Sequence, residues 1–164
     1  MRRFLGLLLL SALVGCGFHL RSTQGLEILA GNAHVSASNI YSPLTRELEN
    51  MLVSQGVDLV PASSAEYTIR ILTERTHRRP VATSGDISVA EYELMMTVSF
   101  QITDASGAVV LPTTTLVTER IYSFDTESFV GSSEEEEMLS EEMRTDIANR
   151  LLRRFASSLI SQSS

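Results

Sequence analysis

The 164-residue chain contains one cysteine, three histidines, no tryptophan and no lysine. A single cysteine excludes an internal disulfide and a cysteine-based metal site. The histidines, His19, His34 and His77, are scattered along the chain and lack the spacing of metal ligands. Because lysine is absent, arginine is the only residue type that is cationic at every physiological pH. We expect neither a bound metal nor a cofactor.

The chain also lacks an apolar run of the about 20 residues that a transmembrane helix requires. Leu5–Val14 is almost entirely apolar, but it is short and follows a basic start, which is typical of a secretory signal peptide. The order Leu13-Val14-Gly15-Cys16 resembles a bacterial lipobox and favours lipidation over a plain signal peptide. We therefore expect residues 1–15 to be a lipoprotein signal peptide and Cys16 to carry the lipid anchor.

The acidic balance of the chain disfavours one large class of partner. Removing residues 1–15 removes two arginines and no acidic residue, which leaves 11 arginines (13 less 2) against 20 acidic residues. The net charge of −9 repels phosphate backbones, so we expect no nucleic-acid partner.

Two amphipathic helices are predicted. The first begins at Ser42, a good N-cap before Pro43, and carries its apolar stripe to Gly56. The second, longer helix is predicted to begin with a capping box of Ser133 and Glu136 and to run towards the C-terminus. The apolar stripe of this second helix contains Leu139, Met143, Ile147, Leu151, Phe155 and Leu159.

Strand patterns occupy most of the sequence between the helices. Residues 91–103 alternate apolar and polar side chains more regularly than any other segment. Residues 66–73 alternate in the same way, and residues 115–124 follow a strand break expected at Pro112. Weaker candidate strands lie at residues 34–39 and 57–60.

This order of elements predicts an α+β domain. We expect a mostly antiparallel sheet of about four strands with two helices packed on one face, which leaves the other face exposed or covered by a partner. The expected organisation is a signal peptide at 1–15, a lipid-anchored tether at 16–33, a single domain at 34–160 and a frayed tail at 161–164.

No catalytic motif is present, and we expect the chain not to be an enzyme. The sequence has no Gly-x-Ser-x-Gly elbow, phosphate-binding loop or His-Glu-x-x-His motif. A serine hydrolase using His77 and Asp86 stays open as an alternative, since one sequence does not exclude their meeting a serine in space. The acidic run Glu134–Glu137 fits a solvated helix start better than a cation site, because calcium loops need alternating ligands around a glycine turn.

One dense basic cluster lies in an otherwise acidic domain. Arg75, His77, Arg78 and Arg79 fall within five positions before Pro80. A solvated strand end is the simpler interpretation from composition alone. The functional interpretation is an anion contact, either to lipid phosphates or to the carboxylates of a partner, because arginine forms strong charge-assisted bonds with both.

Several motifs resemble one family in the same order along the chain. Cys16-Gly-Phe-His-Leu-Arg21 is similar to the start of the LPS-assembly lipoprotein LptE family. Ser42–Leu48 resembles its first helix, and Ala90–Val98 resembles its long strand. Phe124-Asp125 before an acidic helix resembles its last strand and C-terminal helix.

The resemblance implies two helices on a four-stranded sheet and no enzymatic activity. It implies an outer-membrane lipoprotein that plugs the lumen of the β-barrel LptD, assists assembly of the barrel and helps to deliver lipopolysaccharide to the outer leaflet. Direct contact with lipopolysaccharide would use basic loop residues, but Gly85–Ser88 and Gly131–Glu134 have none, so Arg75, Arg78 and Arg79 are the candidates here. A generic lipid-anchored scaffold of another envelope complex is the alternative.

Overall fold

The computed structural model describes residues 31–83, 89–125 and 129–162. The expected signal peptide, Cys16, most of the expected tether and Asp86 lie outside the described residues. The elements are β1 (Gly31–Ala37), α2 (Pro43–Ser54), β2 (Val57–Leu59), a 3₁₀ turn η3 (Ala62–Ser64), β3 (Tyr67–Thr83), β4 (Val89–Asp104), β5 (Val109–Asp125) and α3 (Phe129–Gln162).

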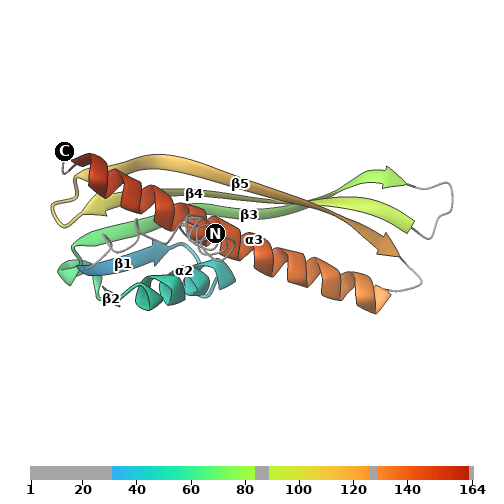
Figure 1. Ribbon diagram of the computed structural model, residues 1–164, viewed down its shortest axis with the longest axis horizontal. Coiled ribbons are helices and arrows are strands. Elements are labelled where there is room, and N and C mark those ends of the chain that lie inside the picture. Colours follow the sequence, from blue (N-terminus) through green and yellow to red (C-terminus); the bar gives the residue numbers. More distant parts are fainter. Residues whose placement is uncertain (1–30, 84–88, 126–128, 163–164) are drawn as a thin grey trace, which may run out of the picture.

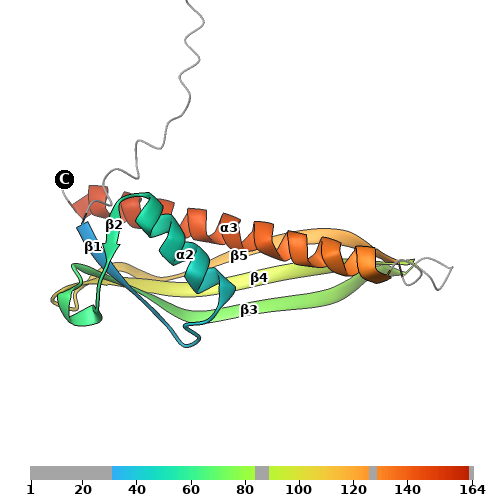
Figure 2. The ribbon, with the colours of Figure 1, turned by 90° about the horizontal axis from the view of Figure 1, so that it is seen from below.

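One five-stranded sheet forms the body of the molecule, in the order β2-β1-β3-β4-β5. β1 runs parallel to both β2 and β3, whereas β3, β4 and β5 form an antiparallel meander. Helices α2 and α3 cover one face of this sheet, as Figure 2 shows from below. The predicted α+β class is confirmed, and the short segment after Gly56 supplies a fifth strand.

The meander extends well beyond the other two strands. β1 pairs only with residues 67–71 of β3, so residues 72–83 form a free strand edge. We call residues 72–83, together with the parts of β4 and β5 that pair alongside them, the arm (Figure 1). The first half of α3 lies along the arm, and α3 in total has 34 residues, or about 50 Å at 1.5 Å per residue.

Two prolines did not end their strands, contrary to the prediction at Pro112. Pro112 lies where the β4–β5 register shifts between Phe100 and Ile102, and Pro80 lies at a similar shift between β3 and β4. Both prolines occupy edge segments, where a missing N–H disrupts no ladder on the free side. β3 therefore continues through the basic cluster, which lies beyond the predicted strand at residues 66–73.

The capping box predicted for the last helix is wrong. α3 begins at Phe129, so Ser133 and Glu136 lie inside it, and its first turn has no acidic residue. At the other end of the domain, β1 begins at Gly31, three residues before the predicted strand. By contrast, α2 begins as predicted: Ser42 Oγ accepts a hydrogen bond of 3.2 Å from the Thr45 N–H, and Pro43 is the first helical residue.

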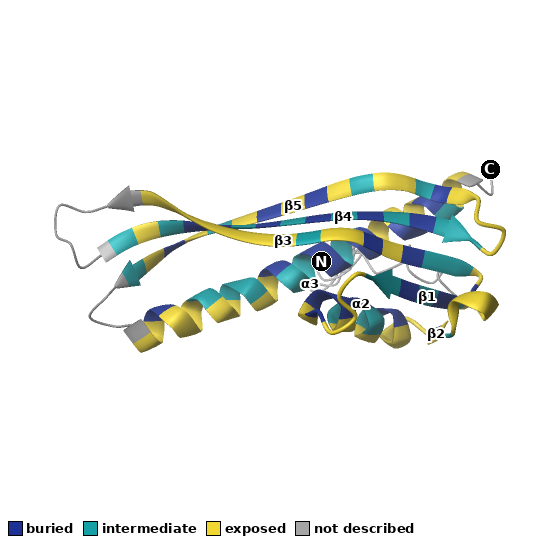
Figure 3. Cartoon of the chain, turned by 180° about the vertical axis from the view of Figure 1, so that it is seen from behind, coloured by how far each residue is buried: buried dark blue, intermediate teal, exposed yellow. Residues whose placement is uncertain are grey.

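The core lies between the sheet and the two helices. Alternate residues of β4 point to this layer and are fully buried, while the residues between them are mostly half-buried on the other face (Figure 3). Tyr67 of β3 and Phe155 of α3 meet edge to face, with ring centroids 5.3 Å apart. The largest fully buried side chains are Phe100, Phe155, Leu44, Leu48, Leu52, Ile69, Leu94, Met96, Ile102, Met143, Ile147 and Leu151.

Candidate functional site

The four residues of the predicted basic cluster lie on the arm but not on one face of it. In the β3–β4 register, Arg78 is opposite Leu94, whereas His77 and Arg79 are opposite Met95 and Glu93. Successive side chains of a strand point to opposite faces, so Arg78 faces α3 and the other three face away from it. The structure therefore divides the cluster into an inner and an outer part.

The inner part joins the arm to α3 through polar contacts of Arg78, Tyr122 and Glu136, which we call the clasp. Arg78 Nη1 donates to Glu136 Oε2 at 2.9 Å and to the Tyr122 hydroxyl at 3.4 Å. The guanidinium also lies 4.6 Å from the centre of the Tyr92 ring and 5.7 Å from that of Phe124, which are cation–π distances. Nη1 and the face of the guanidinium are therefore engaged within the fold, although the side chain is still 43% exposed.

The protonation states around Arg78 support a structural role. Burial raises the pKa of the Tyr122 hydroxyl, and its hydrogen bond to Glu136 raises the pKa further, while Arg78 acts in the opposite direction. Hydrogen bonds to Tyr122 and Glu136 raise the pKa of Arg78 above its ordinary value. Tyr122 therefore stays a neutral donor and Arg78 stays a cation at any physiological pH.

Arg79, in the outer part, neutralises a buried acid. Its Nε and Nη2 both bond to Glu93, the second at 3.2 Å to Oε1. Glu93 is only 7% exposed, so removing Arg79 would leave a charge without its counterion in a partly apolar environment. Arg79 is exposed, but its strongest bonds are already made to the neighbouring strand.

Arg75 and His77 are the members of the cluster available to a ligand. Both are exposed on the outer face, and within residues 31–83, 89–125 and 129–162 neither makes a side-chain hydrogen bond or ion pair. Their neighbours across the register are Thr97 and Met95 of β4. The arrangement presents one guanidinium and one imidazole to any group that covers this face.

The outer face also carries apolar residues that the sequence pattern did not single out. Val117 and Ile121 of β5 are 39% and 64% exposed, and in register they lie opposite Thr97 and Glu93. Met95 is half-buried between β3 and β5 on the same face. The alternating pattern of residues 116–122 could have predicted these exposed apolar side chains. Leu116, Thr118 and Tyr122 are buried, while the residues between them are not.

Two of the four glutamates in the acidic run Glu134–Glu137 form ion pairs. Glu136 belongs to the clasp, and Glu137 accepts from Arg144 at 3.1 Å. In the part of the chain that the structure describes, no three His, Cys, Asp or Glu side chains come together in a metal-binding arrangement. Among the described helices, none combines the length and apolar character that a membrane span requires.

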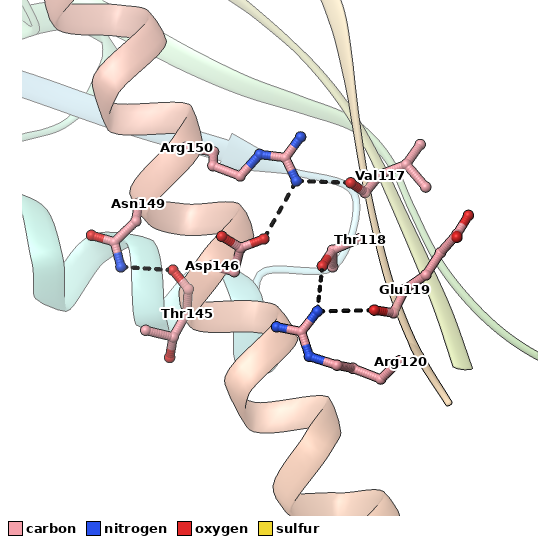
Figure 4. A network of polar contacts seen from close by, with 8 residues as sticks. All are labelled: Val117, Thr118, Glu119, Arg120, Thr145, Asp146, Asn149 and Arg150. Atoms are coloured by element: carbon pink, nitrogen blue, oxygen red, sulfur yellow. Dashed lines mark hydrogen bonds and ion pairs between the residues drawn. The ribbon is translucent and has the colours of Figure 1, made fainter. Parts of the chain in front are cut away.

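Arg150 of α3 ties the edge strand β5 to the helix, whereas the two hydrogen bonds of Arg120 stay within β5 (Figure 4). Arg150 Nη1 donates to the Val117 carbonyl at 2.8 Å and to Asp146 at 3.3 Å. Arg120 of β5 donates to the Glu119 carbonyl at 2.9 Å and to the Thr118 hydroxyl at 3.3 Å. These contacts fill unpaired carbonyl positions of the edge strand β5.

Solved bacterial lipoproteins share this fold. Rare lipoprotein B from Shewanella oneidensis superposes with a TM-score of 0.70 at 27% identity, over 81% of this chain and 99% of that one. A minor lipoprotein from Acinetobacter baumannii gives a TM-score of 0.64 at 24% identity, over 77% and 90% of the two chains, which is a likeness in fold.

Sequence comparison defines the family more closely. The family model LptE, described as lipopolysaccharide-assembly, matches residues 27–155. The LPS-assembly lipoprotein LptE of Photorhabdus laumondii is 30% identical over 155 residues, covering 92% of this chain and 84% of that protein. The LptE of Pectobacterium atrosepticum is 27% identical over 142 residues, covering 85% and 76%.

The chain therefore belongs to the LptE family. The resemblance found in the sequence is confirmed, and so is the expectation that the chain is not an enzyme, because the family is one of non-enzymatic assembly lipoproteins.

Proposed function

We propose that this chain is an outer-membrane lipoprotein, anchored through acylated Cys16, that binds and plugs the barrel LptD. In this role it assists barrel assembly and the delivery of lipopolysaccharide to the outer leaflet. The proposal is supported by membership of the LptE family and by relatives named as LPS-assembly lipoproteins. On this view the domain lies on the periplasmic side of the membrane and inside the barrel lumen.

The structural observation that carries the proposal is the uncovered face of the sheet. Both helices pack on one face, and the outer face exposes Val117 and Ile121 beside Arg75 and His77. A surface of exposed apolar residues surrounded by polar ones is typical of a protein–protein contact. An elongated arm with such a face is suited to insertion along the wall of a larger partner.

Co-purification tests the partner. The tagged chain is purified from detergent-solubilised membranes, and a barrel identified by mass spectrometry as LptD is expected in equal stoichiometry. A Cys16→Ser chain behind a cleavable signal peptide is expected to keep the complex, because the folded domain supplies the interface. Recovery of a different envelope complex, or of the chain alone, would contradict the proposal and favour a generic scaffold.

We propose in addition that the arm contacts lipopolysaccharide directly. The predicted contacts were Arg75, His77, Arg78 and Arg79, and their geometry now ranks them: Arg75 and His77 are unpartnered among the described residues, whereas Arg78 and Arg79 hold ion pairs. A guanidinium free of internal bonds is the stronger candidate for a phosphate of the ligand.

Binding of purified lipopolysaccharide to matched variants tests this contact. Arg75→Gln/His77→Gln is expected to weaken binding several-fold without loss of stability, since neither side chain makes a hydrogen bond or ion pair in the described fold. Arg46→Gln/Arg70→Gln is the control, because both arginines are exposed and lie outside the cluster. Equal binding by both double variants and the parent chain would contradict a role for the arm.

A further inference from the structure

Charge is strongly segregated along α3. Between residues 129 and 142 the helix has six glutamates and no arginine, whereas between 143 and 162 it has four arginines and one aspartate. In a chain with an excess of acidic residues, the second half of α3 is therefore a local basic surface. The arginines of this half are Arg144, Arg150, Arg153 and Arg154.

Three of these arginines share one face of the helix. Positions 150, 153, 154 and 157 are spaced i, i+3, i+4 and i+7, which places them side by side. Arg150, Arg153, Arg154 and Ser157 line a groove whose floor includes Leu116 of the edge strand β5.

The three arginines of the groove differ in how they are used. Arg150 is held by the Val117 carbonyl and Asp146, as Figure 4 shows. Arg153 and Arg154 are exposed, and no side-chain hydrogen bond or ion pair engages them within the described ranges. Two guanidiniums beside a fixed third one make a site with capacity for an anion.

The dipole of α3 does not account for their position. Cations near a helix C-terminus are stabilised, but the effect falls off within the last turn. α3 ends at Gln162 and has no basic residue in its last turn, so Arg153 and Arg154 lie about two turns away from the favourable position. The helix dipole therefore does not explain why two arginines without an ion pair in the described fold lie at these positions.

Their place in the fold indicates what they face. Ala33 of β1 pairs with Tyr67, and the Tyr67 ring contacts Phe155, next to the arginines in α3. The start of β1 and the end of α3 therefore lie at the same end of the molecule (Figures 1 and 2). Gly31 follows Cys16 by 15 residues, a length of chain that spans at most about 50 Å.

We propose that the groove of Arg150, Arg153 and Arg154 binds the phosphate groups of anionic phospholipid at the surface of the membrane that holds the anchor. This inference rests on the lipidation of Cys16 proposed above. The tether joins the fold at the end of the molecule where α3 ends, so this basic end is held closer to the headgroups than the acidic end is. Each arginine there gains attraction from the negative surface. The acidic half of α3 is repelled from that surface, so the segregated charges set the orientation of the domain.

The test uses the full mature domain with Cys16→Ser, so that the acyl chains do not mask weaker contacts. Co-sedimentation is measured with vesicles of phosphatidylcholine alone and with vesicles containing about a third phosphatidylglycerol. Binding is expected only to the anionic vesicles and is expected to weaken as salt is raised. Arg153→Gln/Arg154→Gln is expected to reduce partitioning by about five-fold for each arginine, or roughly 25-fold in total.

The matched control, Arg46→Gln/Arg70→Gln, changes the net charge equally and is expected to bind nearly as the parent does. Equal losses in the two double variants would show a non-specific charge effect and overturn the site. Undiminished vesicle binding by Arg153→Gln/Arg154→Gln would overturn it as well.

A third measurement separates this inference from the proposed function. LptD capture is compared for the parent and for Arg153→Gln/Arg154→Gln, and no change is expected. Loss of capture with unchanged vesicle binding would assign the groove to carboxylates of the barrel and would contradict the lipid assignment. Loss of vesicle binding with capture intact would support it, and failure of the parent to capture LptD would count only against the proposed function.

Discussion

At the scale of single residues, the hydrogen bonds of one aspartate organise the β4–β5 turn. Asp104 Oδ1 accepts from the Ser106 hydroxyl at 2.6 Å, from the Ser106 N–H at 2.8 Å and from the Ala108 N–H at 2.9 Å. The hydroxyl bond, followed by the backbone bonds, holds the pKa of Asp104 below its ordinary value. Gly107 completes the turn with a φ of 84°, which favours glycine.

The depressed pKa of Asp104 predicts a pH-dependent contribution to stability. A carboxyl whose pKa is lower in the folded state stabilises the fold above its ordinary pKa of 3.8, and this contribution is lost progressively as the pH falls from that value through the lower folded-state pKa. Asp104→Asn is therefore expected to reduce the free energy of unfolding at pH 7 and to differ less from the parent near pH 3. Urea unfolding at both pH values measures this, and a constant difference would contradict it.

Arg78 is predicted to act mainly in the fold rather than on a ligand. Arg78→Met keeps the apolar stem but removes the ion pair with Glu136 and the cation–π contacts. The pair is partly exposed, so the expected loss is only about 1 kcal/mol in the free energy of unfolding. Arg70→Met, at an exposed arginine without such contacts, is expected to change stability little.

A double-mutant cycle of Arg78→Met with Glu136→Gln measures whether the two residues act together. A coupling free energy near zero would show that the clasp contributes nothing and would return Arg78 to the set of possible ligand contacts. Thermal unfolding of the four proteins under one buffer condition is sufficient for the measurement.

At the scale of elements, the first turn of α2 is joined to the arm through Ser42. Its Oγ accepts from the Thr45 N–H and donates to Glu74 Oε2 at 2.6 Å, so one hydroxyl satisfies the helix start and a carboxylate of β3. Ser42 is 3% exposed, which makes the loss of either bond costly. The same group therefore fixes both the beginning of a helix and its position against the sheet.

Ser42→Ala is expected to lower the free energy of unfolding by about 1–2 kcal/mol, because it removes the N-cap and leaves Glu74 without its donor. Ser54→Ala is the matched control, since Ser54 is exposed at the end of the same helix and bonds only to the Met51 carbonyl. Chemical unfolding of both variants provides the comparison, and equal losses would contradict the special role of Ser42.

At the scale of the whole molecule, the two faces of the sheet have different environments. One face is buried under α2 and α3, and the other exposes apolar residues of β5 along the arm. If LptD covers the outer face, residues on that face should become inaccessible in the complex. Residues on the solvent side of α2 provide a comparison of similar exposure in the free chain.

Single cysteines introduced into the Cys16→Ser chain test which face the barrel covers. Ile121 is 64% exposed on the outer face and Val53 is 57% exposed on α2. Both cysteine variants are expected to react with a maleimide at similar rates in the free chain. In the complex, Ile121→Cys is expected to lose more reactivity than Val53→Cys, and the reverse order would place the helical face against the barrel.

Elements whose signals are local could be predicted from the amino-acid sequence alone. The cap at Ser42, the stripe of α2 and the alternation of β4 each depend on neighbouring residues, and each was predicted correctly. Family membership was also readable from short motifs in a fixed order. Strand ends were predicted less accurately, because Pro112 indicates a break unless the strand is known to lie at an edge, and the basic residues 75–79 indicate a solvated strand end.

How the candidate residues are used became clear from contacts in the folded chain. Spacing alone grouped four basic residues, but pleating separates Arg78 from Arg75, His77 and Arg79, and partners far away in the sequence occupy two of them. The same holds for Arg153 and Arg154, whose role depends on the edge strand beside them and on the end of the fold where β1 begins. Which charges a fold leaves free is set by contacts between distant segments, and local sequence does not contain those contacts.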